Sequence, residues 1–442
     1  MGNEHSFFAK AAEAKEEILK LRQPLVLGHY DCDGICSTAI AHGALNNAGI
    51  SHRVRNERKL DEKIIHELNS TGEKELLFCD LGSSVAAVQD LKADTIIILD
   101  HHPPAHKKGL QINPHIFGFD GAQDICSAGV AYSVFKEYLD VSLVGMIGDM
   151  QYPISQKKLN SIILKEGQEK KAVKVETDIT FFGRMSRPLQ YFLSYADDPF
   201  LPGLTANEEK SAQFVESLGI KLKKGEDFKT YADLDEEEKR ELVSGIVTHL
   251  ESRGMHEAAK SVIGEVYTLL QRQHGSEFSD AKEFSTIMNA CGRNDRADIG
   301  ISTCLGELGA SKHALTLLQQ HRVNLRNGIE FAQKNYIDLG KFYFLDARGI
   351  IDDGIIGVVA GMLYAPKRTK PIFACALDKE GGIKFSGRGT RLLVANGLDL
   401  GKILSQASAS VGGAGGGHNI AAGATIPNEK LNEFLLELGK LI

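Results

Sequence analysis

Short apolar runs and amphipathic stretches alternate along the first third of the chain, from residue 24 to residue 149. The apolar runs are too short and too uniformly apolar for anything but buried strands, and helices are expected in the gaps between them. This alternation is typical of a parallel α/β sheet. The predicted strands are 25–27, 75–79 and 95–99, and the predicted helices are 7–21, 35–48 and 83–91.

The pattern changes twice further along the chain. Between about 156 and 273 the strand signal fades and acidic helix starts, such as 235–238, predict a helical insertion. After Ser279 mixed patterning returns, with strands expected at 370–377 and 382–386 and a closing helix at 431–441. The predicted fold is α/β, with a parallel-sheet domain over 1–160, a helical bridge and insertion over 161–278, and a smaller mixed α/β domain over 279–442.

One helix of the insertion has an apolar face at Leu242, Ile246 and Leu250, and such a face must be buried. Burial against another molecule would make the segment from about 204 to 273 a partner-docking or substrate-guiding module. Burial within the chain would make it ordinary packing. Both interpretations stay open.

The composition is that of a soluble globular protein, with 43% hydrophobic and 25% charged residues among 442. Lys and Arg number 51 against 58 Asp and Glu, a net charge of −7, so a nucleic-acid site would have to be local. There is no run of about 18 apolar residues and no signal-peptide order at the N-terminus. Seven scattered cysteines without a CxxC pair suit a reducing compartment. We therefore expect a cytoplasmic protein with no membrane contact.

Acids and histidines follow the predicted strands. Because the carboxyl ends of parallel strands gather at one edge of a sheet, these side chains are expected in one small volume. So many carboxylates raise one another's pKa unless a cation lies among them. Mixed carboxylate and imidazole ligands favour Mn²⁺, with Mg²⁺ as the alternative, and suffice for two ions. The candidates are His29, Asp31, Asp33, Asp80, Asp100, His101, His102 and Asp149.

Two cations about 3.5–4 Å apart activate water and hold the oxygens of a displacement at phosphorus, so this cluster predicts phosphoester hydrolysis. The competing interpretation makes each acid a helix N-cap at a strand–helix junction, where Asp is favoured. Capping does not explain the two adjacent histidines or the alternation of His29, Asp31 and Asp33. We interpret the nearby Cys32 and Cys36 as packing residues.

A second candidate site lies near the end of the chain, where Gly415, Gly416, Gly417 and His418 follow further glycines. Glycines let backbone N–H groups approach an anion, and a helix starting near Ile420 would add its positive end. This favours a phosphate cradle over a flexible linker. Ser386 and Arg388, at the end of a predicted strand, add a hydroxyl and a guanidinium suited to phosphate.

These motifs resemble those of the DHH phosphoesterase family in its DHH plus DHHA1 form, and the resemblance covers nearly the whole chain. The branch that the chain is most similar to is that of the archaeal RecJ-like single-strand nucleases, on the segments 188–190, 198–204 and 289–293. The five family motifs correspond in order to His29–Gly34, Asp80, Asp100 with His101 and His102, Asp149, and Gly415–His418.

The resemblance implies roles for the metal-site residues. Asp80 would bridge two metals, His102 would contact the scissile phosphate or assist the leaving group, and Asp100 would orient the histidine pair. The remaining ligands would be His29 and Asp31 on one metal, and Asp33, His101 and Asp149 on the other.

The resemblance also implies a substrate site and partners. Arg293, Ser386, Arg388 and His418 would grip substrate phosphates from the DHHA1 side of a cleft between the domains. Archaeal RecJ-like proteins join GINS-type replication proteins, so a link to DNA replication or repair is implied.

Three functions are compatible with the sequence. The leading one is a metal-dependent exonuclease on single-stranded DNA or RNA. The second is a phosphodiesterase on short oligonucleotides or cyclic dinucleotides, which the net charge and the lack of a segment assignable to an OB-fold favour. The third is a replisome scaffold with secondary catalysis, against which the intact set of acids and histidines argues.

Overall fold

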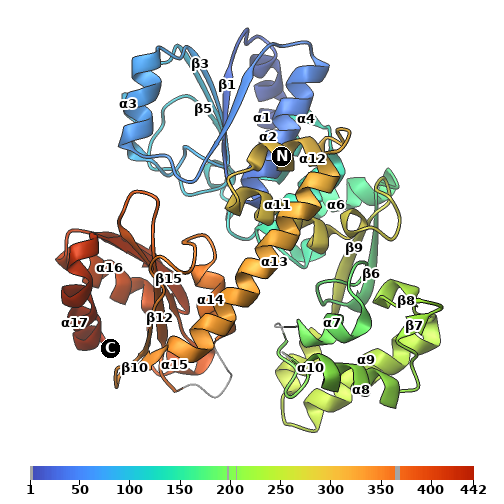
Figure 1. Cartoon of the computed structure of the whole chain (residues 1–442). Helices are drawn as coiled ribbons and strands as arrows, with labels where there is room; N and C mark the ends of the chain where they lie inside the picture. Colours follow the sequence, from blue (N-terminus) through green and yellow to red (C-terminus); the bar gives the residue numbers. More distant parts are fainter. Residues whose placement is uncertain (1–2, 197–198, 206, 364–368) are drawn as a thin grey trace. The chain divides into compact units, whose positions relative to one another are not determined.

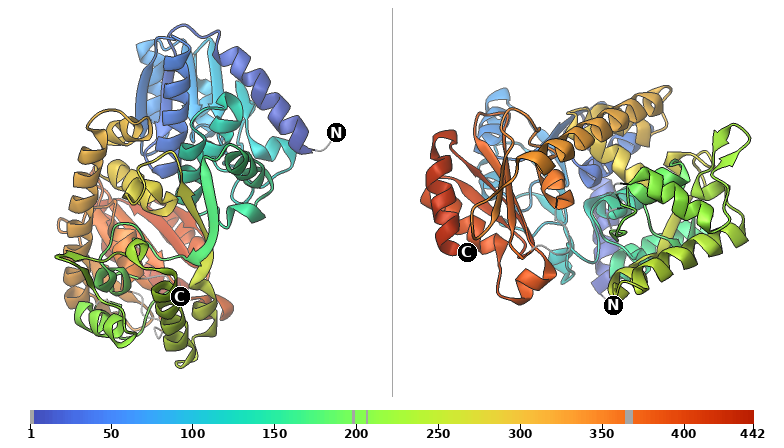
Figure 2. Two further views of the ribbon diagram at one scale, coloured as in Figure 1. Left: turned by 90° about the vertical axis from the view of Figure 1, so that its right-hand side faces the viewer. Right: turned by 60° about the horizontal axis from the view of Figure 1, so that its bottom comes forward.

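The computed structural model describes residues 3–196, 199–205, 207–363 and 369–442, so Asp198 of the archaeal-type segment lies outside the described residues. The chain forms two compact units, Met1–Leu318 and Gln319–Ile442. Each is described by itself below, and both are drawn in Figures 1 and 2. Among the described residues, no helix is both long enough and apolar enough to cross a membrane.

The first unit is built on a parallel five-stranded sheet in the order β2-β1-β3-β4-β5. Alternate strand residues face opposite sides: Val26 packs with α1, α2 and α4, whereas Leu25 and Leu27 pack with α3. Figure 1 shows these helices on the two faces. The strands are β1 (Leu25–His29), β2 (Arg53–Glu57), β3 (Glu75–Cys79), β4 (Thr95–Leu99) and β5 (Leu110–Ile112).

The three predicted strands are thus confirmed, and two edge strands were missed. β2 is polar except for Val54, and β5 has three residues. The helix expected at 83–91 is instead a short 3₁₀ turn, η1 (Ala86–Asp90), because the start of that segment is held by a bond from Ser83 N to Asp100. The helices of this half are α1 (Asn3–Ile18), α2 (Cys32–Asn47), α3 (Glu62–Thr71), α4 (Ser127–Phe135), α5 (Leu139–Gly148) and α6 (Lys158–Glu169).

The insertion is only partly helical. Two strands, β6 (Val173–Ile179) and β9 (Ile263–Leu269), form an antiparallel ribbon that the sequence pattern missed, because most of β6 is not buried. Leu242, Ile246 and Leu250 are fully buried in the insertion's own core, so their apolar face is not free for a partner. The other elements are α7 (Leu189–Ser194), α8 (Glu208–Ser217), β7 (Lys223–Lys224), β8 (Asp227–Phe228), α9 (Glu236–Glu251) and α10 (His256–Ser261).

Three α-helices follow β9 in the chain and precede the sheet of the second unit. α11 (Ala281–Arg293) and α12 (Ala297–Cys304) pack in the core of the first unit with α2 and α5. α13 (Ala310–Asn335) runs across the boundary between the units.

The second unit contains a six-stranded sheet in the order β10-β11-β12-β13-β15-β14, in which β11 and β12 are parallel and the other pairs antiparallel. α16 and α17 cover one face and α14 the other (Figure 2). The strands are β10 (Ile337–Asp338), β11 (Tyr343–Asp346), β12 (Ile372–Leu377), β13 (Ile383–Arg388), β14 (Ala414–Gly417) and β15 (Ala421–Ile426). The helices are α14 (Ile356–Met362), α15 (Arg391–Ala395), α16 (Leu400–Ser410) and α17 (Leu431–Leu441).

The strands predicted at 370–377 and 382–386 and the closing helix are confirmed, but the helix expected near Ile420 is wrong. Residues Ala421–Ile426 form β15, between β13 and β14. Ala422, Ala424 and Ile426 are buried and alternate with less buried residues, the period-two pattern of a strand. Small side chains concealed that pattern from the sequence analysis.

Candidate metal centre

The adjacent strands β1, β3 and β4 deliver the predicted residues to one edge of the sheet. His29 ends β1, Asp80 follows β3 and Asp100 follows β4. Asp31 is the N-cap of α2, where its side chain accepts a hydrogen bond from Gly34 N. Two further candidates lie on helices: Asp33 in the first turn of α2, and Asp149 as the C-cap of α5.

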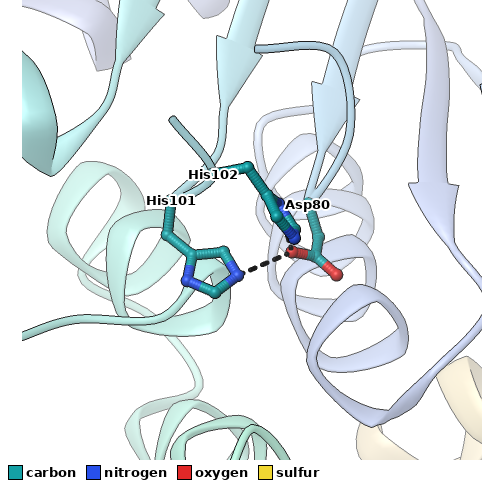
Figure 3. A group of neighbouring side chains, drawn as sticks. All are labelled: Asp80, His101 and His102. Atoms are coloured by element: carbon teal, nitrogen blue, oxygen red, sulfur yellow. Dashed lines mark ion pairs between the residues drawn. The ribbon is translucent and has the colours of Figure 1, made fainter. Parts of the chain in front are cut away.

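Asp80 lies at the centre of the group. Its Oδ2 is 3.3 Å from His29 Nδ1, and its Oδ1 is 3.4 Å from His101 Nε2 and 3.8 Å from His102 Nδ1. Figure 3 shows both rings directed at this carboxylate. The two oxygens of one carboxylate therefore face two separate sets of ligands, as a bridging position requires.

Three sets of side chains could each hold a metal ion, because their ligand atoms lie within 4.8 Å of one another. His29 Nδ1 is buried and makes no hydrogen bond with the described residues, although Asp31 Oδ1 is 3.1 Å away. A buried imidazole nitrogen without a hydrogen bond, beside carboxylate oxygens, fits a divalent cation of the Mn²⁺ type. The sets are His29, Asp31 and Asp80; Asp33, His101 and Asp149; and Asp80, His101 and His102.

The first turn of α4 holds two of these carboxylates in place. Ser127 N and Ala128 N donate to the two oxygens of Asp33, at 2.7 and 2.8 Å. Ser127 Oγ donates to Asp80 Oδ1 at 2.9 Å. Asp33 thus accepts two backbone N–H groups at the start of α4, while the N-cap of its own helix is Asp31. The capping interpretation therefore holds for Asp31, and Asp33 stays a ligand candidate. Sequence reasoning missed Ser127, although a serine before an apolar run is a helix-start signal.

The two histidines are oriented by different groups. His102 Nδ1 lies 2.8 Å from Asp100, which also accepts the backbone N–H groups of both histidines. His101 Nδ1 instead donates to Gly121 O at 2.9 Å, which leaves Nε2 to face Asp80. Gly121 must be glycine, because a Cβ there would be 1.8 Å from His101 O.

Gln151 was also missed by the sequence analysis. Its Nε2 donates to Gly121 O at 2.7 Å and to Asp149 Oδ2 at 2.8 Å, and its Oε1 accepts from Asn160. It thereby fixes Asp149 relative to the carbonyl that orients His101. Nothing in the sequence marks a glutamine two residues after an acid.

Burial and neighbouring charges shift the pKa values of Asp33, Asp80 and Asp149 in different directions. Burial, then the charges of Asp80 and Asp149, raise the pKa of Asp33 well above its usual range. Burial is also the first cause that raises the pKa of Asp149 to about 6. Burial would raise the pKa of Asp80 too, but His101 and His29 outweigh it and lower that pKa. The acids thus lack positive charge, which a cation would supply.

The two histidines beside Asp80 respond in the opposite direction. Burial alone would lower the pKa of His29, but Asp31 and Asp80 outweigh it and raise that pKa to about 11. For His101, burial is likewise outweighed by Asp80, Asp149 and Asp33, which raise its pKa well above the usual value. By themselves these rings hold protons that a metal would have to displace.

The 289–293 segment lies against the first motif. Cys32 N donates to Asn289 Oδ1 at 3.1 Å, and a Cβ on Gly292 would be 1.7 Å from Tyr30 O. Arg293 follows at the end of α11, so it belongs to the unit of the metal centre rather than to that of Ser386 and Arg388. Cys32 and Cys36 are buried free thiols, as predicted.

The second unit brings Ser386, Arg388 and the glycine run into one sheet. A Cβ on Gly357, in α14, would be 2.8 Å from Arg388 Nη2 and 3.0 Å from Ser386 Oγ, so both groups converge on that glycine. Burial lowers the pKa of Arg388. Gly415–Gly417 belong to the edge strand β14, where Gly416 pairs with Gly423, which in turn pairs with Ser386. His418 lies in the exposed turn between β14 and β15, and its N–H donates to Ala421 O.

Three family models match successive parts of the chain. The N-terminal domain of the DHH family matches residues 23–162, the DHH-CID domain 181–263 and the DHHA1 domain 340–442. An uncharacterised protein of Methanocaldococcus jannaschii is 31% identical in an alignment of 433 positions that covers 94% of this chain and 92% of that protein.

Two solved structures share the fold at low sequence identity. The Mn²⁺ complex of RecJ from Thermus thermophilus has a TM-score of 0.59 at 17% identity; the match covers 98% of this chain but only 54% of that one. Cdc45 from Entamoeba histolytica has a TM-score of 0.65 at 13% identity, covering 99% of this chain and 98% of that one. The motifs, the three matched domains and the archaeal relative together show that this chain belongs to the DHH phosphoesterase family, in the form that carries a DHHA1 domain.

Proposed function

We propose that the protein is a metal-dependent phosphodiesterase that acts as an exonuclease on single-stranded DNA or RNA. The observation that carries the proposal is the position of Asp80, whose two oxygens face His29 on one side and His101 on the other. Two divalent cations on either side of this carboxylate, with Mn²⁺ the best fit, would share it. When bound, they would activate water for attack and neutralise charge on the phosphoryl oxygens.

His102 is placed to act on the substrate itself. Its side chain is 45% exposed, and the bond between Nδ1 and Asp100 directs the other ring nitrogen outward. That hydrogen bond is the largest cause that raises the pKa of His102. A proton held on the outward nitrogen would contact the scissile phosphate or pass to the leaving oxygen.

Charge in the second unit supports a phosphate-gripping role for Ser386, Arg388 and the glycine strand. That unit has 15 basic against 11 acidic side chains, a net charge of +4, whereas the first has 36 against 47, a net charge of −11. Arg293 would add a guanidinium beside Asp31. A link to replication or repair through GINS-type partners is carried by the resemblance alone.

The net charge of −11 on the first unit as a whole also favours a second candidate, a phosphodiesterase on substrates of a few nucleotides, because that unit would repel a long polyanion. The dependence of binding on substrate length distinguishes these two candidate functions. A nuclease that tracks a strand should bind ten or more nucleotides tighter than two, with a salt dependence that reflects several phosphates.

The test uses end-labelled DNA and RNA strands of two to thirty nucleotides with Mn²⁺ or Mg²⁺, and an Asp80→Asn protein as the inactive control. We expect stepwise release of mononucleotides from one end, with KM falling as the strand lengthens. Hydrolysis confined to dinucleotides or cyclic dinucleotides would favour the second candidate. A wild-type protein that binds Mn²⁺ but cleaves no phosphodiester would overturn both and leave a scaffold.

A further inference from the structure

The turn that follows Asp149 combines a left-handed residue with an exposed apolar side chain. α5 ends with Met150 N bonded to Ile147 O at 3.1 Å and Gln151 N bonded to Met146 O at 2.9 Å. This pair of bonds closes a helix when the residue after the cap is left-handed, and Met150 has φ +58°. Glycine is the residue that this position favours, since it has no Cβ to strain.

Folding does not explain why a methionine occupies this position. Its side chain is 74% exposed, so it adds little to the core. The helix would end as well, and with less strain, if residue 150 were glycine. A strained residue whose side chain points away from the core, one position after a ligand candidate, indicates a role outside folding.

Tyr152 is the second exposed apolar side chain of the same turn. Gln151 between them is 1% exposed and is held by Gly121, Asp149 and Asn160, so the turn is rigid. Tyr152 is 38% exposed, and Lys282 Nζ lies 5.8 Å from the centre of its ring. Met150 and Tyr152 therefore face outward on either side of an anchored residue.

The turn is close to the proposed reaction site. Asp149 Oδ2 is 3.7 Å from His101 Nδ1. Consecutive Cα atoms are about 3.8 Å apart, so Met150 begins one such step from Asp149 and Tyr152 no more than three steps away. The sugar of a nucleotide separates its base from its phosphate, so a residue that binds the base must lie outside the metal-binding side chains, as Met150 and Tyr152 do.

The geometry points to a base-binding subsite, in which Met150 and Tyr152 form a shelf for the nucleobase of the nucleotide whose phosphate is cleaved. This inference rests on the proposed function. A thioether and a phenol ring offer polarizable contact to the flat face of any base, without selecting its sequence. The face of a base is free only where the strand is unpaired and unstacked, so the Met150–Tyr152 shelf would also select single strands.

The test compares two competitors of strand hydrolysis with Mn²⁺ present: a nucleoside 5′-monophosphate, and ribose 5-phosphate, which has the same phosphate and sugar without a base. We expect the wild type to bind the nucleotide about 5- to 150-fold tighter, the range of one base stack. Met150→Gly and Tyr152→Ala should each reduce that preference, and the double variant should abolish it, while the affinity for ribose 5-phosphate stays unchanged.

Met150→Gly keeps the test independent of folding, since glycine suits the left-handed position and its Tm should be no lower than that of the wild type. Lys171→Gly is the matched control. Lys171 is exposed, has φ +53° and closes α6 with the same pair of bonds, so its replacement relieves the same strain elsewhere. It should leave the base preference intact.

The result that overturns the shelf is an equal affinity for both competitors in the wild type, or an undiminished base preference in the double variant. Strand hydrolysis, measured in the same samples, separates this from failure of the proposed function. Normal hydrolysis without a base preference would reject the base-binding inference alone. If the Mn²⁺-loaded protein neither hydrolysed strands nor bound either compound, the proposed function would be rejected as well.

Discussion

The candidate metal centre of the first unit and the proposed phosphate site of the second differ in how they handle charge. The candidate metal centre buries several ionisable side chains. α4 and Gln151 donate hydrogen bonds to its carboxylates, and the carbonyl of Gly121 accepts one from His101. The Ser386–Arg388 site consists of one guanidinium and one hydroxyl beside glycines. The first arrangement gathers carboxylates that a metal ion would share, whereas the second supplies a guanidinium for phosphate, so chemistry and substrate binding should be separable by mutation.

The largest effect is expected at the bridging carboxylate. Asp80→Asn keeps the shape of the side chain but removes the negative charge that both cations would share, so hydrolysis should fall more than about a thousandfold and Mn²⁺ binding should weaken. Equilibrium dialysis and single-turnover assays measure the two losses. If the Asp80→Asn protein kept near wild-type turnover with Mn²⁺, the two-metal assignment would be wrong. The contrast between the metal centre and the Ser386–Arg388 site would then fail.

Arg388→Ala should instead weaken substrate binding alone. A charged hydrogen bond lost to phosphate costs on the order of 1.5–3 kcal/mol, so KM should rise roughly 10- to 150-fold while Mn²⁺ occupancy is kept. His418→Ala is expected to act in the same direction.

Arg348→Ala is the control for that experiment, because Arg348 is paired with Asp346 and Asn428 in the same unit. Its replacement should leave KM unchanged. Loss of bound Mn²⁺ in the Arg388 variant would show that the two sites are not separable.

Ser127→Ala tests whether the hydrogen bonds around the metal centre matter to it. The hydroxyl to Asp80 Oδ1 is lost while the backbone bond to Asp33 remains, so Mn²⁺ affinity should fall about tenfold, and Ser127→Thr should restore it. Titration of the metal alone is the readout. Ser133→Ala is the matched control on the same helix, since its hydroxyl bonds only to Gly129 O among the described residues. Equal Mn²⁺ affinities in the Ser127→Ala and Ser133→Ala variants would show that the Ser127 hydroxyl does not support the metal site.

The smallest effect on catalysis, and a clear one on stability, is expected at Glu283. Burial, and then Asp280, raise the pKa of this α11 residue to about 7. The folded state therefore holds an extra proton between pH 4.5 and 7, and the free energy of unfolding falls as the pH rises through that window.

Glu283→Gln should remove that decline and stabilise the protein at pH 8 by on the order of 1–3 kcal/mol. Urea unfolding at pH 5 and pH 8 measures it. Glu433→Gln, on the exposed surface of α17 and paired with Lys430, should change neither value. If the wild-type protein were equally stable at pH 5 and pH 8, ionisation of the buried Glu283 would not lower the free energy of unfolding.

The sequence predicted the clustering of acids and histidines better than the backbone around the proposed phosphate site. Parallel strands that end in acids must place them together, and His29, Asp80 and Asp100 lie on adjacent strands as expected. What holds them could not be predicted. The carbonyl of Gly121 and the hydroxyl of Ser127 reach the cluster through the packing of loops and α4, and a hydrogen bond between distant residues leaves no mark in periodicity.

For the proposed phosphate site, the structure brings Ser386, Arg388 and the glycine run into one sheet, but the backbone conformation expected after the glycines was wrong. A run of glycines has no side-chain period, so it could precede a helix as readily as a strand. Pairing with β15 decides the matter, and that pairing is set by contacts between residues far apart in the chain. The same limit explains why the polar strand β2 and the ribbon of β6 and β9 were missed.

The bonds from α4 have a practical consequence for spectroscopy. Because backbone amides orient both oxygens of Asp33, and Ser127 orients Asp80, these candidate ligands should keep their directions when one ion is exchanged for another. We therefore expect that a chelator can strip the protein of metal, and that Co²⁺ or Cd²⁺ can refill it, without unfolding. The optical bands of the first ion and the nuclear resonance of the second report the number of nitrogen and oxygen ligands directly. A group of side chains that keeps its geometry without metal would make this protein suitable for such probes.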